Sequence, residues 1–108
     1  MNPTTSSRDL SNASRGYVYL LRSMKDEKFY LGSTTNLKRR LDEHNKGLMV
    51  STKNRRPFKL VYTESFVTAH LARLYESKLK RNPNMYQLFK RRALLCASMP
   101  NGGREVVG

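Results

Sequence analysis

The chain has 108 residues, which suffices for one compact domain with a modest core but not for two independent domains. Its 21 Lys and Arg residues against 8 Asp and Glu give a formal net charge of +13, which indicates a polyanionic partner. Nucleic acid is the first candidate, because phosphates neutralised by Lys or Arg release counterions. A membrane is not expected as partner, since we find no amphipathic helix with a bulky apolar face and no spanning segment.

The two ends of the chain differ in composition from its middle. Residues 1–15 are rich in Ser, Asn and Thr and lack the apolar core of a signal peptide, so we expect a disordered arm. Residues 97–108 contain Pro and Gly and predict a flexible tail, which leaves residues 16–96 as the domain. The single cysteine, Cys96, cannot form an internal disulfide and indicates a reducing compartment, the cytoplasm.

Two short runs of aromatic and branched residues open the domain. Residues 16–22 and 28–32 each predict a strand, and residues 23–27 form a polar turn between them. A connection this short favours an antiparallel hairpin over a parallel crossover. The hairpin would place two tyrosine-bearing strands side by side.

A helix and a third strand are predicted next. Capping side chains precede residues 37–46, which predict a helix that ends at Gly47. Residues 48–57 are polar and basic and predict an exposed loop. The alternation in residues 58–63 predicts a strand.

The last part of the domain predicts two more helices. Thr68 can cap a helix over residues 69–80, and the Asn82-Pro83-Asn84 sequence breaks it. A strongly basic helix follows over residues 85–96. This order of elements predicts an α+β fold in which helices flank a small three-stranded antiparallel sheet.

Two polar side chains of the first predicted helix stand beside its apolar face. Leu37 and Leu41 define the face that this helix buries. Arg40 and His44 stand at helical spacing from these leucines and share or border that face. Placement at the boundary, with the arginine head in water, explains both residues as well as a functional role does.

Glu76 lies along the edge of the apolar stripe of the second predicted helix. One interpretation is a surface glutamate paired with Lys80 at i+4. The other is a carboxylate aimed into a basic cleft, where it holds a hard divalent cation against a phosphate. The residues alone favour the first interpretation.

Three tyrosines, Tyr17, Tyr19 and Tyr30, lie on the two strands of the predicted hairpin. Tyrosines in strands are usually packing residues with a solvated hydroxyl. A phenol becomes a proton acceptor when a cation lowers its pKa, and this basic chain supplies many cations.

The combination of these residues resembles a known family. Tyr17-Val18-Tyr19 followed by Tyr30-Leu31-Gly32 is similar to the paired motif that names the GIY-YIG nuclease superfamily. Arg40, His44 and Glu76 match the catalytic arginine, the frequent histidine and the metal-binding glutamate of that family. The resemblance covers residues 16–92 and is strongest to small stand-alone bacterial members, which resemble the nuclease domains of excision-repair and homing enzymes.

The segment from Ser51 to Phe58 is also similar to those small proteins, and two features depart from the wider family pattern. Tyr17 replaces the first glycine of the motif, as it does in many small members. The asparagine that many relatives carry after the glutamate has two candidates here, Asn82 and Asn84.

The resemblance implies a metal-dependent DNA endonuclease that hydrolyses phosphodiester bonds, as in DNA repair. Glu76 would bind one divalent ion, Mg²⁺ or Mn²⁺, together with the phosphate. Tyr19 or Tyr30 would accept a proton from the attacking water, Arg40 would offset charge on the phosphoryl oxygens, and His44 would orient or relay a proton. Gly32 would let the strand approach the phosphate.

Further basic residues would contact the nucleic-acid backbone, namely Lys53, Arg55, Arg56, Lys78, Lys80 and Arg81. DNA is the expected partner with RNA as the second choice, and the protein is expected to act as a monomer or weak dimer. The alternative function is a basic nucleic-acid-binding module that has the same fold and little or no catalysis.

Overall fold

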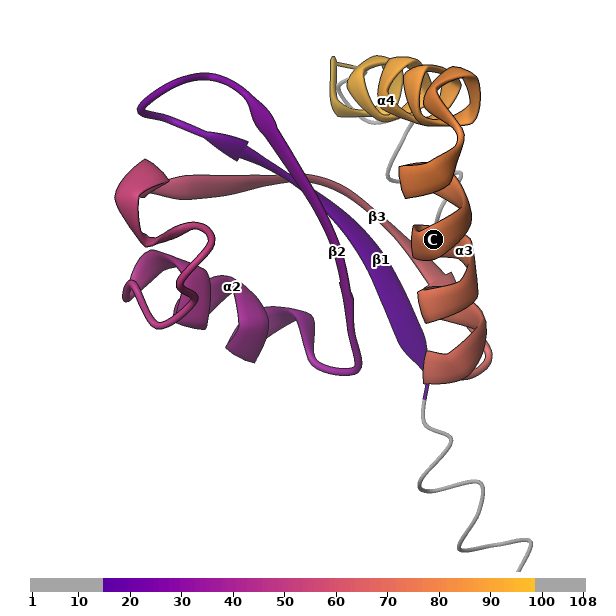
Figure 1. Ribbon diagram of the computed structural model, residues 1–108, viewed down its shortest axis with the longest axis horizontal. Helices are drawn as coiled ribbons and strands as arrows, with labels where there is room; N and C mark the ends of the chain where they lie inside the picture. Colours follow the sequence, from indigo (N-terminus) through magenta and orange to yellow (C-terminus); the bar gives the residue numbers. More distant parts are fainter. Residues whose placement is uncertain (1–14, 99–108) are drawn as a thin grey trace, which may run out of the picture.

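Figure 1 shows the computed structural model, in which residues 15–98 are described. Its elements are the strands β1 (Gly16–Ser23), β2 (Phe29–Thr34) and β3 (Phe58–Phe66), the helices α2 (Leu37–Asn45), α3 (Ala69–Arg81) and α4 (Pro83–Ser98), and a 3-10 turn, η1 (Lys53–Arg55). The strands form an antiparallel sheet in the order β2-β1-β3. The predicted α+β fold is therefore confirmed, including the hairpin of the first two strands.

The predicted arm and tail fall largely outside the described residues. Nothing in the described range tests the prediction for residues 1–14 or for residues 99–108. Helix α4 continues through residues 97 and 98, so the ordered part extends beyond the predicted end at residue 96. None of the helices in residues 15–98 is long and apolar enough to cross a membrane.

The central strand β1 sends alternate side chains to opposite faces of the sheet. Val18 and Leu20 enter an apolar cluster with α3 and α4, whereas Tyr19 and Leu21 enter a second cluster with α2. In Figure 1, α2 lies on one side of the sheet, and α3 and α4 lie on the other. The α3/α4 face and the α2 face of the sheet are thus two separate packing layers.

The α3/α4 face carries a wholly apolar cluster. Its buried members are Val18, Leu20, Leu31, Ala72, Leu79, Phe89 and Ala93. Helix α3 begins close to β1 because Gly16 has no side chain, and a Cβ at Gly16 would lie 2.6 Å from Ala69 Cα. Burial of these side chains stabilises the domain through the hydrophobic effect.

Helix α2 is fixed at both ends, close to the predicted bounds. The Asn36 side chain accepts a hydrogen bond of 3.0 Å from the Arg39 backbone N–H, and Gly47 follows the helix with a φ of +78°. The Asn45 side chain accepts a hydrogen bond from Phe58 N at 2.6 Å and donates one to Phe58 O at 3.1 Å. These contacts join the end of α2 to the beginning of β3.

Helices α3 and α4 are separated by a single residue, Asn82. Thr68 caps α3 as predicted, by accepting a hydrogen bond of 3.1 Å from Leu71 N. The predicted start of the last helix at residue 85 is wrong, because α4 already begins at Pro83. Proline is tolerated in the first turn of a helix, and the Asn82 side chain caps α4 by accepting a hydrogen bond of 3.2 Å from Met85 N.

Candidate functional site

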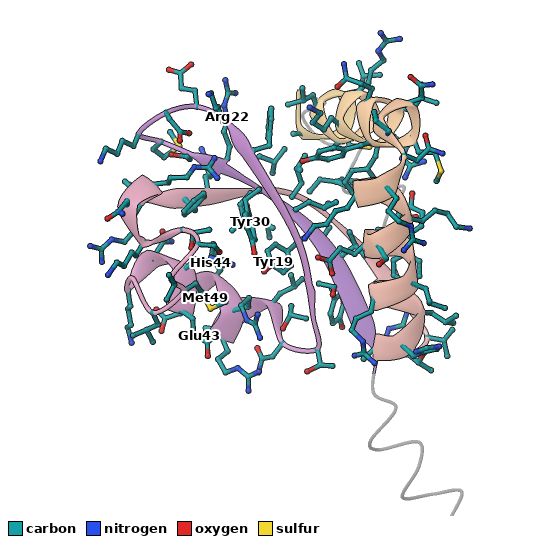
Figure 2. All side chains as sticks on the ribbon, in the orientation of Figure 1. Tyr19, Arg22, Tyr30, Glu43, His44 and Met49 are labelled. Carbon is teal, nitrogen blue, oxygen red and sulfur yellow. The ribbon has the colours of Figure 1, made fainter. Side chains whose placement is uncertain are left out.

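A buried chain of three polar side chains runs from β1 through α2 to the loop before η1. The Tyr19 hydroxyl lies 2.9 Å from His44 Nε2, and His44 Nδ1 lies 2.7 Å from Thr52 Oγ1. His44 and Thr52 are fully buried, and Tyr19 is only 2% exposed. Figure 2 shows Tyr19, Tyr30 and His44 together between the sheet and α2. Boundary placement, one of the two interpretations of His44, is therefore wrong.

Burial also decides the protonation state of this chain. Burial, followed by the nearby Tyr30, raises the pKa of the Tyr19 phenol above its usual range, while the charge of Arg40 and a hydrogen bond from it act in the opposite direction. Burial lowers the pKa of His44, Arg40 adds to this effect, and Glu43 opposes it. At neutral pH, Tyr19 is therefore a neutral phenol and His44 a neutral imidazole.

Arg40 reaches the same site from α2. Its Nε lies 3.0 Å from Glu43 Oε1, which is an ion-pair distance, but this buried N–H has no aligned acceptor among residues 15–98. The side chain is 27% exposed and acts on the pKa of Tyr19 as described above. Boundary placement thus describes Arg40 only in part, since its Nε is buried. A buried donor without an aligned partner is available to an incoming anion.

Gly32 faces Tyr19 across the β1–β2 pair. The two residues are register partners, and a Cβ at Gly32 would lie 2.5 Å from the Tyr19 hydroxyl oxygen. The missing side chain therefore makes room for the Tyr19 ring. The sequence suggested room for a phosphate at this glycine, and that role stays a prediction.

Glu76 approaches the edge strand β2 from α3. Ser33 Oγ donates a hydrogen bond of 2.6 Å to Glu76 Oε1, and Lys80 Nζ lies 2.7 Å from Glu76 Oε2. The Glu76 side chain is 18% exposed, and its charge contributes to the raised pKa of Tyr19. Lys80 Nζ also lies 6.0 Å from the centre of the Tyr30 ring. The predicted pair with Lys80 is thus present, and Ser33 is a partner that the sequence did not indicate.

The residues around Glu76 fit a hard divalent cation only with help from the substrate. Residues 15–98 hold no group of three or more His, Cys, Asp or Glu side chains placed to share a metal ion. Glu76 offers a single carboxylate, a hard oxygen ligand of the kind Mg²⁺ and Mn²⁺ prefer. Mg²⁺ usually keeps several waters and binds through one or two carboxylates plus substrate phosphates, which matches this donor set.

A pocket of about 280 Å³ lies beside Ser33, where β2 ends and α3 begins. Its lining residues are Ser33, Thr34, Thr35, Arg39, Arg40, Ala69 and Arg73. Arg73, Glu76 and Lys80 stand at i, i+3 and i+7, so they share one side of α3. The pocket thus combines hydroxyl groups with arginines from α2 and α3. Sequence reasoning missed Arg73, although its spacing from Glu76 was the signal.

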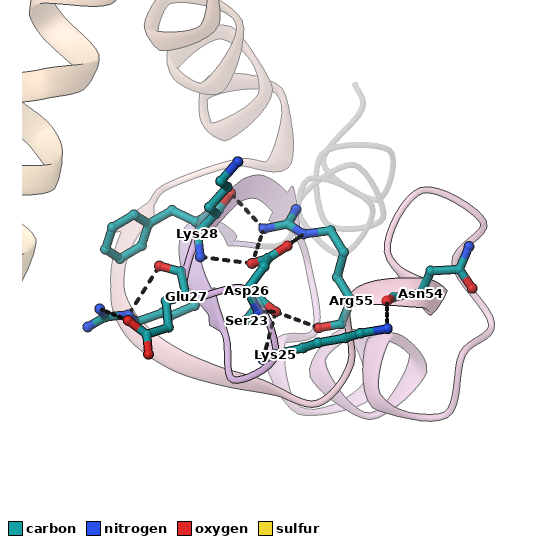
Figure 3. A network of polar contacts seen from close by, with 9 residues as sticks. Ser23, Lys25, Asp26, Glu27, Lys28, Asn54 and Arg55 are labelled. Atoms are coloured by element: carbon teal, nitrogen blue, oxygen red, sulfur yellow. Dashed lines mark hydrogen bonds and ion pairs between the residues drawn. The ribbon is translucent and has the colours of Figure 1, made fainter.

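Arg55, one of the predicted nucleic-acid contacts, is engaged within the protein. Its Nε lies 2.7 Å from Asp26 Oδ2, and its Nη2 donates to Phe29 O at 3.4 Å. Arg55 holds the pKa of Asp26 well below its usual range. Figure 3 shows how these contacts, with the hydrogen bond from Ser23 Oγ to Arg55 O, join the β1–β2 turn to η1. Its structural role is therefore clear, and its nucleic-acid contact stays a prediction.

The other predicted backbone contacts fall into two groups. Lys53 and Arg56 are exposed in the loop on the α2 side, where the Arg56 guanidinium lies against Gly47. Lys78 and Arg81 are exposed on α3, next to Lys80. Helices α2 and α3 lie on opposite sides of the sheet (Figure 1), and the nucleic-acid contacts of both groups stay predictions.

The two candidate asparagines have different surroundings. The Asn82 side-chain oxygen is occupied by the cap of α4. Asn84 lines a groove between the beginning of β2 and α4, together with Phe29 and Leu88. Neither environment decides which asparagine completes the site, so both candidates stay open.

Comparisons with known proteins identify the family of this chain. Residues 15–88 match the model of the GIY-YIG catalytic domain. The chain is 42% identical over 73 residues to a UPF0213 protein of Clostridium perfringens, covering 64% of this chain and 77% of the relative. It is 43% identical over 65 residues to a UPF0213 protein of Natronomonas pharaonis, covering 59% of this chain and 75% of the relative.

A solved structure is also similar, the solution NMR structure of a UPF0213 protein from Bacillus halodurans. It shares 33% sequence identity, covers 73% of this chain and 86% of its own, and superposes with a TM-score of 0.45. The family model spans the sheet, α2, α3 and the beginning of α4, and therefore every residue of the candidate site. The chain belongs to the GIY-YIG family of nuclease domains.

Proposed function

We propose that this protein is a metal-dependent endonuclease that hydrolyses phosphodiester bonds in DNA. Family membership supports nuclease chemistry, and the net charge of +13 supports a nucleic-acid substrate. The observation that carries the proposal is the 2.9 Å contact between Tyr19 and His44, with Arg40 and Glu76 close enough to act on the pKa of Tyr19. The phenol, the imidazole and the guanidinium thus lie on the α2 face of the sheet, and the carboxylate reaches the edge strand β2 from α3.

Tyr19, rather than Tyr30, is the proton acceptor in this proposal. The attacking water gives a proton to the Tyr19 oxygen while the Tyr19 proton passes to His44 Nε2, so the phenol stays neutral throughout. The water oxygen forms the new bond to phosphorus, the bond to the leaving oxygen breaks, and that oxygen takes a proton from solvent. Tyr30 supports the site by packing, with its ring centre 5.0 Å from that of His44.

Arg40 and Glu76 act on the phosphate. The unaligned Arg40 N–H donates to the phosphoryl oxygens, where negative charge develops. Glu76 would hold a Mg²⁺ or Mn²⁺ ion, which would supply positive charge beside the phosphate. Because Lys80 occupies Glu76 Oε2 at 2.7 Å, its ammonium must move aside when that oxygen takes a cation.

The test is cleavage by the parent protein and by Glu76→Gln, which keeps an oxygen for Ser33 but loses the charge. Labelled supercoiled, linear, single-stranded and branched DNA, and RNA, are incubated in low salt with Mg²⁺ or Mn²⁺. We expect metal-dependent cutting of DNA by the parent, and loss of cutting with retained DNA binding in Glu76→Gln, because this carboxylate holds the ion rather than the backbone.

The matched control is Glu64→Gln. Glu64 also pairs with a basic side chain, Arg92 at 2.8 Å, but belongs to β3 and takes no part in the proposed chemistry. The Glu64→Gln variant should therefore cut DNA at the rate of the parent protein. Unchanged cutting by Glu76→Gln would refute the role of Glu76. Binding without any cutting, unaffected by EDTA, would identify a nucleic-acid-binding module instead.

A further inference from the structure

Thr52 is a fully buried polar residue in a segment that is otherwise mostly exposed. Its neighbours Ser51 and Lys53 face solvent, whereas the Thr52 side chain points to His44, with Oγ1 2.7 Å from Nδ1. The backbone around it is a tight turn, in which Thr52 N and Lys53 N donate to Met49 O at 3.0 and 2.9 Å. The turn therefore delivers one hydroxyl into the interior, where an unpartnered hydroxyl would be costly.

The direction of the hydrogen bonds follows from counting hydrogens. His44 is a neutral imidazole, so only one of its two ring nitrogens carries a hydrogen. Tyr19 is a neutral phenol, and His44 Nε2, which lies 2.9 Å from the Tyr19 oxygen, can accept its hydrogen. The Thr52 hydroxyl hydrogen has its own acceptor, Met49 O at 3.5 Å, so Oγ1 can accept from Nδ1.

The opposite tautomer of His44, with the hydrogen on Nε2, leaves fewer buried polar groups with a hydrogen-bond partner. If His44 carried its hydrogen on Nε2, that nitrogen would donate to the Tyr19 oxygen. The buried Tyr19 hydrogen would then need a further acceptor, and the Thr52 hydrogen would leave Met49 O for Nδ1. An unsatisfied buried donor is costly, so the first arrangement is favoured.

We propose that Thr52 is a positioning residue that holds His44 as the Nδ1–H tautomer, so that Nε2 is free to take the proton of Tyr19. Its part in catalysis rests on the proposed nuclease function, but the tautomer itself does not. Thr52 touches no reacting atom, and it acts by deciding which ring nitrogen is the acceptor. Without that hydrogen bond, the ring would also populate the Nε2–H form, which cannot accept the Tyr19 proton.

The experiment is ¹⁵N–¹H correlation NMR of the imidazole rings in the parent, in Thr52→Val and in Thr52→Ser. The chain has two histidines, and the exposed His70 gives an internal reference in the same spectrum. We expect a protonated Nδ1 and an unprotonated Nε2 for His44 in the parent, a mixture of tautomers in Thr52→Val, and the parent pattern in Thr52→Ser. A protonated Nε2 in the parent would overturn the proposal even if neither variant folded.

Kinetics add a second measurement. We expect Thr52→Val to lower kcat by about 10- to 100-fold, the effect that is usual when a group that orients a metal-bound histidine is lost. KM should not change, and Thr52→Ser should restore kcat. A tautomer that is the same in the parent and in Thr52→Val would exclude the positioning role. If the parent cuts no nucleic acid but shows the expected tautomers, the assignment of Thr52 stands and the proposed nuclease function falls.

Discussion

The two faces of the sheet are built by the same strands but use their buried positions differently. On the α3/α4 face every buried side chain of the cluster is apolar. On the α2 face, Tyr19, Leu21 and Phe58 share the interior with buried polar residues, among them His44 and Thr52. A polar group in a core contributes less to stability than an apolar one of similar size. The comparison teaches that the α3/α4 face stabilises the domain, whereas the α2 face holds in position the groups to which we assign the chemistry.

The largest expected effect tests the α3/α4 face. Phe89 is 2% exposed, and its ring centre lies 5.6 Å from that of Tyr62 and 6.0 Å from that of Tyr75. Phe89→Ala should lower the free energy of unfolding by about 3–5 kcal/mol, because it removes packing and leaves a cavity. Urea denaturation measures this loss, and the cleavage rate per folded molecule should not change.

The control for Phe89 is Leu88→Ala, since Leu88 is the adjacent residue on α4 and is 64% exposed. Its unfolding free energy should stay within about 0.5 kcal/mol of the parent. A normal stability for Phe89→Ala combined with a large loss of turnover would erase the distinction between the two faces.

The next effect tests the α2 face. Arg40→Ala should lower turnover by about 100- to 1000-fold, the usual effect of removing a donor that stabilises charge in the transition state. Lys38→Ala removes a positive charge from an exposed position of the same helix and should cut like the parent. Single-turnover cleavage separates the two variants. If Arg40→Ala weakens only the affinity for DNA, Arg40 binds a phosphate without stabilising the transition state. The role that we assign to Arg40 on the α2 face would then be wrong.

The same contrast explains how much of the molecule could be predicted from sequence. The hairpin, the bounds of α2 and the cap of α3 followed from local patterns, because apolar periodicity, Gly47 and Thr68 act within a few residues. The family motif identified Tyr19, Arg40, His44 and Glu76 as candidates. Local patterns thus predicted structure well where the responsible contacts are short in sequence, whereas the roles of the motif residues stay predictions.

The contacts that sequence reasoning missed join distant segments. The burial of Thr52 depends on a turn that folds back onto α2, and nothing in a basic loop distinguishes this threonine from a solvated one. Arg55 was predicted only as a nucleic-acid contact, because its ion-pair partner, Asp26, lies in another turn of the chain. The need for a glycine at position 32 could have been predicted from the hairpin alone, because the register pairs Gly32 with Tyr19 and a side chain at Gly32 would collide with the Tyr19 ring.

The smallest expected effect tests the sheet edge, where the two faces meet at the pocket beside Ser33. Arg73 belongs to α3, lines this pocket with Arg40 of α2, and is exposed. If Arg73 binds a DNA phosphate there, Arg73→Ala should weaken binding, lower the slope of log Kd against log salt by about one, and leave kcat unchanged.

Arg91→Ala is the matched control, since it removes an arginine from the exposed surface of α4. Titration of a labelled duplex at several salt concentrations measures both slopes. A smaller slope for Arg73→Ala and an unchanged slope for Arg91→Ala would place the DNA backbone across the edge strand β2, in contact with elements from both faces. Equal slopes for Arg73→Ala and the parent would instead confine the DNA to the α2 face, and Glu76 would then have to reach the phosphate without a neighbouring anchor from its own helix.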